Sequence, residues 1–267
     1  MKKYKIGFIG TGNIATAIFN GITASGYIKQ NEIVVFDVNE DKTNYFSNCG
    51  AAVSQSSQEL CSLSEYVFLT IKPQVYDVVL SGLKECAHDT CFIDVAAGIS
   101  IKKVKEMLGY DAPVVRVMPN TPISVSMGSS ALVKMAPVTD EQFDFVKGCF
   151  DSCGVTSIVK EEQINTVIAI SGSSPAYIMR FAKNLIDFAV NDGLNETDAS
   201  ALVTQTLAGC AKLIKNSNTD ISTLIKNVTS PNGTTEAGLK SLDADMFDET
   251  LFKCLNATVK RAEDLSN

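Results

Sequence analysis

The feature that most constrains this chain is a glycine-rich turn between an apolar segment and a helical one near the N-terminus. Residues 5–9 read Lys-Ile-Gly-Phe-Ile and run directly into Gly-Thr-Gly-Asn-Ile-Ala at residues 10–15. In this pattern Gly10 permits a tight turn, Gly12 lets the backbone approach a pyrophosphate, and Ala15 allows the helix to pack closely on the strand. Free N–H groups at the helix start favour the negative charge of phosphates. The turn therefore predicts a dinucleotide site, with a turn that serves packing alone as the alternative.

An acidic residue after the next apolar segment strengthens this prediction. The apolar residues 33–36 are followed by Asp37, about 25 residues beyond Gly12. This is close to the spacing of the acid that binds ribose hydroxyls. A carboxylate accepts a hydrogen bond from a 2′-OH but repels a 2′-phosphate, and residues 38–41 contain no Arg. NADH is therefore favoured over NADPH, unless Lys42 turns toward a phosphate. The alternative is an aspartate that only caps the following helix.

Up to about residue 160, short apolar runs alternate with helical segments, which is typical of βαβ units and a parallel sheet. The expected strands are residues 5–9, 33–37, 66–71, 91–95 and 114–117, with a further pair near 130–135 and 155–159. The expected helices between them are residues 13–24, 40–48, 74–85, 101–108 and 140–152. Right-handed crossovers would place these helices on both faces of the sheet.

The character of the chain changes after residue 161, where β-branched clusters thin out and segments rich in Ala, Leu, Ile and Lys follow. These segments predict helices at residues 175–191, 196–216 and 249–265. Asn195 with Asp198 three residues later resembles a helix N-cap. We therefore expect an α/β Rossmann-type doubly wound domain over residues 1–160 and an all-α domain over residues 161–267.

Two further loops are expected to meet the dinucleotide, because ligands of doubly wound sheets bind at the carboxyl ends of the strands. They are residues 70–73, where Lys72 is placed to reach a phosphate or ribose oxygen, and residues 95–98, whose small side chains leave room for a flat ring. Each loop would otherwise be an ordinary strand-to-helix turn. The predicted cofactor-binding residues are Phe8, Ile9, Gly10, Thr11, Gly12, Asn13, Ile14, Asp37, Ser57, Thr70, Ile71, Lys72, Pro73, Val95, Ala96, Ala97 and Gly98.

Composition narrows the classes of function. A net charge of −7 without any concentration of Lys and Arg gives no electrostatic reason for binding nucleic acid. The basic N-terminus is soon broken by glycines, and the uncharged residues 163–179 are too few and too polar to span a bilayer. Eight cysteines without a C-x-x-C pattern, and the single His88, predict reduced thiols and no metal site. We expect a cytoplasmic protein bound to neither membrane nor nucleic acid.

Three further segments carry a resemblance to a known family: residues 116–122 (Arg-Val-Met-Pro-Asn-Thr-Pro), residues 171–177 (Ser-Gly-Ser-Ser-Pro-Ala-Tyr) and residues 228–239, which include Ser-Pro-Asn-Gly-Thr-Thr-Glu. With the N-terminal turn, they make the chain similar to pyrroline-5-carboxylate reductase along almost its whole length. The resemblance implies hydride transfer from NADH or NADPH to the C=N carbon of 1-pyrroline-5-carboxylate, which gives L-proline in the last step of proline biosynthesis.

The resemblance also implies a substrate site and an assembly. Backbone N–H groups of residues 230–235 would hold the substrate carboxylate, and Thr235 would be the catalytic residue that orients the ring nitrogen. The helical domain would pair two chains into a homodimer, or dimers into a ring. The implied substrate-binding residues are Asn120, Ser171, Gly172, Ser173, Ser174, Asn227, Ser230, Pro231, Asn232, Gly233, Thr234 and Thr235.

The sequence departs from the family pattern in a few places, and two other functions compete. Asn232 stands where the family often has Gly, and Asp37 replaces the small or polar residue of NADPH-preferring members. Residues 216–220 lack the acidic and proline residues common there, which bears on packing at a dimer interface.

A β-hydroxyacid dehydrogenase would use a catalytic Lys, but Lys183 lies two turns into its helix. A nucleotide-sensing protein without chemistry would be expected to lose the segment around Ser230 first.

Overall fold

The computed structural model describes residues 2–86 and 88–266. The chain divides into two compact units. The first contains the residues up to Pro175 and those from Thr258 on, and the second contains Ala176–Ala257. Across the described residues no helix is both long and apolar enough to cross a membrane.

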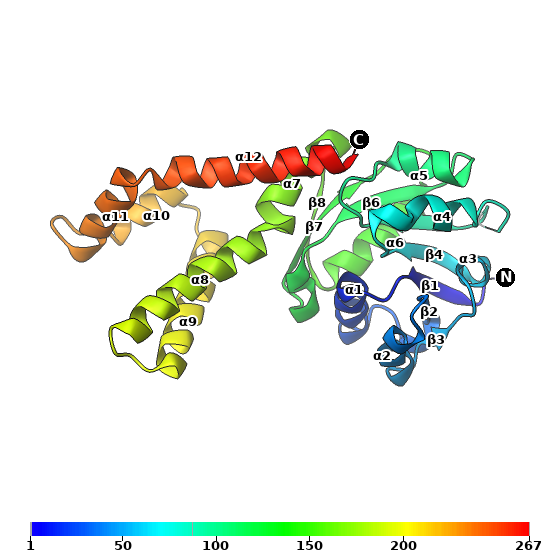
Figure 1. The fold of residues 1–267 in the computed structure, drawn as a ribbon, viewed down its shortest axis with the longest axis horizontal. Coiled ribbons are helices and arrows are strands. Elements are labelled where there is room, and N and C mark those ends of the chain that lie inside the picture. Colours follow the sequence, from blue (N-terminus) through cyan, green and yellow to red (C-terminus); the bar gives the residue numbers. More distant parts are fainter. Residues whose placement is uncertain (1, 87, 267) are drawn as a thin grey trace. The chain divides into compact units, whose positions relative to one another are not determined.

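The first unit is built on a single sheet of eight strands in the order β3-β2-β1-β4-β5-β6-β7-β8 (Figure 1). The six strands from β3 to β6 are parallel, β7 runs antiparallel to β6, and β8 is parallel to β7. The strand order reverses between β1 and β4, which makes the carboxyl ends of these two strands the expected binding crevice. The strands are β1 (Tyr4–Ile9), β2 (Ile33–Phe36), β3 (Ala52–Val53), β4 (Ser64–Leu69), β5 (Cys91–Asp94), β6 (Val114–Met118), β7 (Gly128–Val133) and β8 (Gly154–Ile158).

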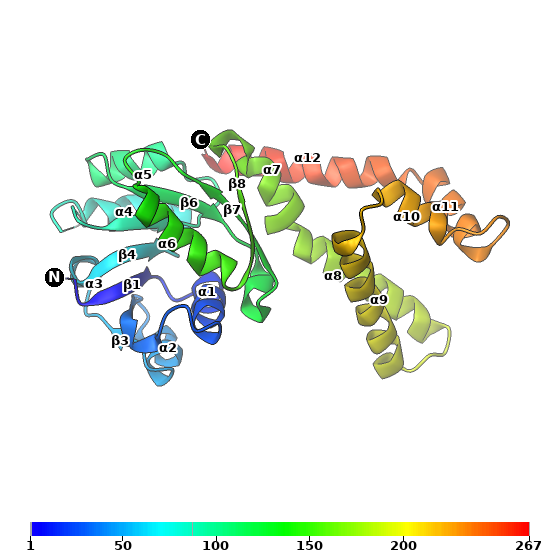
Figure 2. The same cartoon turned by 180° about the vertical axis from the view of Figure 1, so that it is seen from behind.

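Helices cover both faces of this sheet because successive strand residues are buried on opposite faces. Phe8 of β1 lies in the apolar cluster formed with α1 (Asn13–Ala24), α2 (Asn44–Asn48) and α6 (Asp140–Asp151). Ile9, the next residue, lies in the opposite cluster, which includes α3 (Ser57–Leu63), α4 (Tyr76–Ser81) and α5 (Ile101–Leu108). The two sets of helices can be followed in Figure 1 and, from behind, in Figure 2.

The second unit is helical and buries little of its apolar surface within one chain. Of its residues 176–257, all of which the structure describes, Ala199 alone is buried. Large apolar side chains such as Phe188 and Phe252 are 73% and 67% exposed. The helices that follow the sheet are α7 (Ile164–Val167), α8 (Ser174–Asn191), α9 (Glu196–Asn216), α10 (Ile221–Asn227), α11 (Thr234–Ala244) and α12 (Phe247–Ser266).

Several expected elements need correction. The helix expected at residues 40–48 is a 3-10 turn, Glu40–Lys42, capped by the Asn39 side chain and followed by the short α2, which starts after Thr43. The helix expected at residues 74–85 begins with a 3-10 turn at Pro73–Val75 and ends at Ser81, before Gly82. Strands β2, β4 and β5 end before residues 37, 71 and 95, since the chain turns there into the loops of the site. The elements β3, α3, α7 and α10 were not expected.

The first unit also extends beyond residue 160, where the domain boundary was expected. Ile164 and Ile168 are buried against the same apolar cluster as α5, and Glu161 forms an ion pair of 3.0 Å with Arg116 of β6. The residues that lead into α8 are therefore packed in the core of the first unit.

Candidate active site

The turn after β1 is built as the glycine pattern predicts. Gly10 has a φ of +94°, and its N–H donates to the carbonyl of Phe36 at 2.8 Å. A Cβ at Gly10 would lie 2.7 Å from the carbonyl oxygen of Thr70. The Thr70 hydroxyl lies 2.7 Å from the carbonyl oxygen of Gly10 and 3.0 Å from that of Ile9, so its proton ties the two strand ends together. Both the backbone conformation and the close approach require glycine here.

The backbone at the start of α1 is open to a ligand. Gly12 is the N-cap residue of α1, and a Cβ placed on it would meet no atom within 4 Å. Ala15 is fully buried between helix and sheet. A helix N-terminus whose N-cap residue has no side chain, and which no other side chain caps, offers its free N–H groups to a phosphate. The geometry therefore fits a pyrophosphate at Gly12.

The Asp37 carboxylate is fixed by three hydrogen bonds. Its Oδ2 accepts from the N–H and the hydroxyl of Thr11 at 2.9 and 3.1 Å, and its Oδ1 accepts from the N–H of Asn39 at 3.0 Å. Partial burial raises the pKa of Asp37, but these hydrogen bonds and the charge of Lys42 outweigh it, so the pKa is lowered. An ionised carboxylate has about four acceptor positions. One position is therefore left for a ribose hydroxyl.

A hollow of about 530 Å³ lies beside Asp37. Its lining contains the carboxylates of Asp37 and Glu40 and no basic side chain. Ser54 and Gln55 line it, whereas Ser57 begins α3 and is not among the lining residues. The sequence reasoning missed most of this lining, although several of these residues follow the carboxyl ends of β2 and β3. The lining residues are Phe36, Asp37, Val38, Glu40, Thr43, Asn44, Val53, Ser54 and Gln55.

The two other predicted cofactor loops leave the neighbouring strands β4 and β5. In the loop at residues 70–73, Thr70 is buried and Lys72 is exposed. In the loop at residues 95–98, Gly98 has a φ of +82°, and a Cβ there would lie 2.7 Å from the carbonyl oxygen of Leu265 in α12. The predicted cofactor residues other than Ser57 thus gather at the carboxyl ends of β1, β2, β4 and β5. Phe8 and Ile9 are buried in the core, so only their backbone can face a ligand.

Part of the implied substrate set also lies in the first unit. Asn120, directly after β6, donates from its amide to the hydroxyl and carbonyl oxygens of Ser171, both at 3.4 Å. Its Oδ1 accepts from the N–H of Ser129 at 2.9 Å. Residues Ile168–Gly172 form a π-helical turn, closed by the N–H of Ser173 on the carbonyl of Ile168 at 2.8 Å. Such turns occur often at functional sites, and Asn120 holds this one in place.

The rest of the implied substrate set lies in one segment of the second unit, between α10, which ends at Asn227, and α11. The N–H of Gly233 donates to the carbonyl of Ser230 at 3.0 Å, and Asn232 has a φ of +59°. Gly233 is the N-cap of α11, and Thr234 and Thr235 are exposed in its first turn. The departure from glycine at Asn232 therefore keeps the tight loop, because Asn tolerates the left-handed conformation.

An acidic side chain reaches back over this loop. The carboxylate of Glu236 accepts from the N–H of Asn232 at 2.5 Å and pairs with Lys240 at 2.9 Å. The hydrogen bond to the Lys240 ammonium and that from Asn232 lower the pKa of Glu236. A carboxylate is thus held by one backbone N–H of the loop before α11, next to the place where the resemblance puts the substrate carboxylate.

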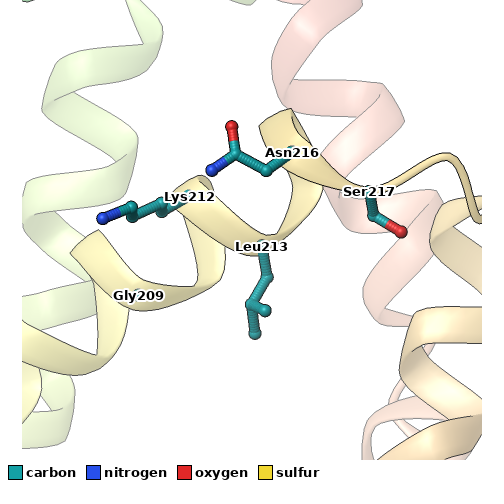
Figure 3. A pocket seen from close by; sticks show the side chains of 5 residues that line it. All are labelled: Gly209, Lys212, Leu213, Asn216 and Ser217. Atoms are coloured by element: carbon teal, nitrogen blue, oxygen red, sulfur yellow. The ribbon is translucent and has the colours of Figure 1, made fainter.

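The helical unit also has a hollow of about 440 Å³ along the C-terminal half of α9. Figure 3 shows Lys212, Leu213 and Asn216 projecting from the C-terminal end of this helix. Leu213 is 63% exposed.

Elsewhere in the unit, Lys183, the residue that a β-hydroxyacid dehydrogenase would need, pairs with Asp187 on its own helix.

The strand order, the glycine turn and the fixed aspartate define the class of dinucleotide-binding oxidoreductases with a Rossmann-type domain. Residues 5–98 match the family model described as NADP oxidoreductase, coenzyme F420-dependent, and residues 161–265 match the model described as pyrroline-5-carboxylate reductase dimerisation. The pyrroline-5-carboxylate reductase of Haemophilus influenzae is 34% identical over 268 residues, which cover 99% of this chain and 98% of that relative. This chain belongs to the pyrroline-5-carboxylate reductase family.

Solved structures agree with this assignment. A pyrroline carboxylate reductase from Plasmodium falciparum, with NADP bound, matches at a TM-score of 0.93 and 30% identity. A pyrroline-5-carboxylate reductase from Coxiella burnetii matches at a TM-score of 0.89 and 33% identity. Each comparison covers 100% of both chains. The fold class and the family resemblance that the sequence predicts are therefore confirmed.

Proposed function

We propose that this protein is a pyrroline-5-carboxylate reductase, which reduces the C=N bond of 1-pyrroline-5-carboxylate to give L-proline, the last step of proline biosynthesis. A nicotinamide cofactor would supply the hydride. The observation that carries the proposal is that a built dinucleotide site and the Ser230–Thr235 segment occur together in a chain that is similar to such reductases along its whole length. Gly10, Gly12 and Asp37 would hold the cofactor.

The reaction explains why no strong acid or base is needed among the residues proposed to bind the substrate. A protonated imine is already an electrophile, and hydride addition leaves an amine that needs no further proton. Positioning therefore supplies most of the rate. The N–H groups at the start of α11 would bind the substrate carboxylate, and the exposed Thr235 hydroxyl would orient the proton on the ring nitrogen.

NADH is the cofactor that we propose this protein prefers. The hollow beside Asp37 presents two carboxylates and no basic side chain in its lining. A 2′-phosphate placed there would meet like charges, which raises the free energy of binding. The Plasmodium falciparum relative carries NADP. The preference for NADH that we propose for this protein rests instead on Asp37 and the residues around it.

We also propose that two chains pair through the helical unit into a homodimer, which is the building block of any larger ring. The matched dimerisation model covers residues 161–265. An all-helical unit with a single buried residue cannot supply the apolar burial that stabilises a fold. A second copy of the same helices would cover the exposed side chains of α8, α9 and α12.

The deciding experiment is the initial rate of nicotinamide oxidation with 1-pyrroline-5-carboxylate, for the wild type and Thr235→Ala. We expect turnover by the wild type and a reduction in kcat/KM of about tenfold or more in Thr235→Ala, because one oriented hydrogen bond to a charged group is lost. Thr204→Ala is the matched control, since its hydroxyl donates only within α9, to the carbonyl of Ser200 at 2.7 Å. NADH binding without turnover would contradict the proposal and favour a nucleotide sensor.

A further inference from the structure

A buried tyrosine hydroxyl joins the ends of two neighbouring strands in the first unit. Tyr76 of α4 is fully buried, and its Oη lies 2.7 Å from Oδ1 of Asp94 and 3.1 Å from the carbonyl oxygen of Leu69. Leu69 and Asp94 are the last residues of β4 and β5, and they are register partners in the sheet. The single proton of Tyr76 is therefore shared at the point where both strands end.

Each of these strand ends leads directly into a loop that the proposed function assigns to the cofactor. Residues 70–73 follow Leu69, and residues 95–98 follow Asp94. Oδ1 of Asp94 also accepts from the N–H of Ala96 at 3.1 Å, inside the second loop. A displacement of Asp94 would therefore move the backbone that faces the ligand.

The other end of the second loop is held by a second acidic residue. The N–H of Ile101, the first residue of α5, donates to Oε1 of Glu161 at 2.8 Å. The same oxygen accepts from Nη1 of Arg116 at 3.0 Å. Arg116 is the register partner of Asp94 on β6. The loop between Asp94 and Ile101 is thus held at both ends, and Arg116 links the register partner of Asp94 to Glu161.

Asp94 is an acid that is buried away from solvent and whose carboxylate is only partly hydrogen-bonded. It is 0% exposed, and among the described residues its Oδ2 and the Nε of Arg116 are buried without a hydrogen-bond partner. A buried carboxylate is costly unless it is paired. The charged groups that face it are Arg116 of β6 and Glu161, and the titratable group is Tyr76 of α4.

We propose that Asp94 and Tyr76 are positioning residues for the cofactor, which hold the loops at residues 70–73 and 95–98 at the spacing that the nicotinamide half of the dinucleotide requires. This proposal rests on the proposed function only for the identity of the ligand. Neither side chain touches the ligand, because both are buried below the loops.

Two variants test it through the Kd for NADH, measured by titration of nicotinamide fluorescence without substrate. Tyr76→Phe keeps the ring and removes the shared proton, and we expect the Kd to rise about fivefold or more because the two strand ends lose their link. Asp94→Asn keeps an oxygen that can accept from Tyr76 and Ala96 but removes the buried charge, and we expect a similar rise. The kcat at saturating NADH should also fall, because a nicotinamide half held at the wrong spacing is poorly placed for hydride transfer.

Tyr66→Phe is the matched control. Tyr66 is a second buried tyrosine of the first unit and lies in β4, where it stacks on Phe145 with ring centroids 4.1 Å apart. Its Kd should stay within twofold of the wild type. Equal Kd values for all three variants, or a lower melting temperature with an unchanged Kd, would overturn the proposal. If Asp94→Asn does not fold, the Kd of Tyr76→Phe for NADH alone tests the proposal. A wild type that binds NADH but does not reduce the pyrroline would contradict the proposed function alone.

Discussion

The Oδ2 atom of Asp37 accepts hydrogen bonds from both the backbone N–H and the hydroxyl of Thr11, at 2.9 and 3.1 Å. Thr11 lies between Gly10 and Gly12, so the acid proposed to bind ribose is linked directly to the backbone proposed to bind the phosphates. This link keeps the carboxylate ionised and aimed at the edge of the hollow beside it.

Replacing Asp37 with Ser should reverse the cofactor preference. The variant removes the charge that repels a 2′-phosphate and retains a hydroxyl that can donate to it, so the ratio of kcat/KM for NADH to that for NADPH should fall by about tenfold to a hundredfold. Steady-state rates with both cofactors measure this ratio. Asp41→Ser is the control, because Asp41 is a nearby acid outside the lining of the hollow. A ratio that does not change would remove Asp37 from cofactor choice.

Gly10→Ala should cost more stability than Gly26→Ala. Both glycines have positive φ, but a Cβ at Gly26 meets nothing within 4 Å, whereas one at Gly10 lies 2.7 Å from the carbonyl oxygen of Thr70. The left-handed backbone costs about 1 kcal/mol at each position, and the collision adds roughly another 1–3 kcal/mol at Gly10. Urea unfolding of the two variants gives the difference. Equal losses would mean that the turn can open away from Thr70.

Glu236→Gln should lower the KM for 1-pyrroline-5-carboxylate. The variant keeps an acceptor for the N–H of Asn232 but removes a charge from the loop that is proposed to bind the substrate carboxylate. Removing one like charge at a solvent-exposed site should lower the KM about twofold to fivefold. Asp243→Asn, in a later turn of the same helix, is the control. A KM that rises or stays constant would indicate that the substrate carboxylate binds elsewhere.

Phe188→Glu should separate the chains. Phe188 is 73% exposed on α8, and a charge there would be buried without a partner in the proposed homodimer. Light scattering at micromolar concentration should give twice the chain mass of 28.6 kDa for the wild type, or a multiple of that, and the single-chain mass for the variant. Val78→Glu is the control, because Val78 is 79% exposed on α4 of the sheet unit. A wild type with the mass of one chain would refute the pairing.

Asp94 should make stability fall as the pH rises between about 4 and 6. Complete burial raises the pKa of Asp94 from 3.8 to about 6, against the smaller effects of Tyr76, Ala96 and Arg116. In this window the folded chain keeps a proton that the unfolded chain releases, so the free energy of unfolding decreases by about 3 kcal/mol and then levels off. Urea unfolding at several pH values should show that the free energy of unfolding of Asp94→Asn rises relative to that of the wild type as the pH increases across this window. Parallel curves would show that Asp94 does not titrate there.

The sequence alone determined the elements whose ends are marked by local chemistry. Helices α1, α5 and α9 have the bounds that the pattern predicts, since Gly12 opens the first and the Ser100 and Asn195 side chains cap the others. The glycine turn and the spacing to Asp37 likewise specified the cofactor crevice, because each requirement there concerns a few neighbouring residues. The two-residue β3 was missed because so short a strand carries no period of its own, and the seven-residue helix α3 was missed as well.

Only the tertiary structure decided which side chains meet across the sheet. Tyr76 and Asp94 come from different elements, and no periodicity in the sequence indicates that they share a proton. The parallel register that brings Leu69 beside Asp94 and Asp94 beside Arg116 makes that contact. The same is true of Asn120 and Ser171, which are 51 positions apart. Local patterns specify elements because their energetics are local, whereas buried polar contacts depend on how the strands align once the core has packed.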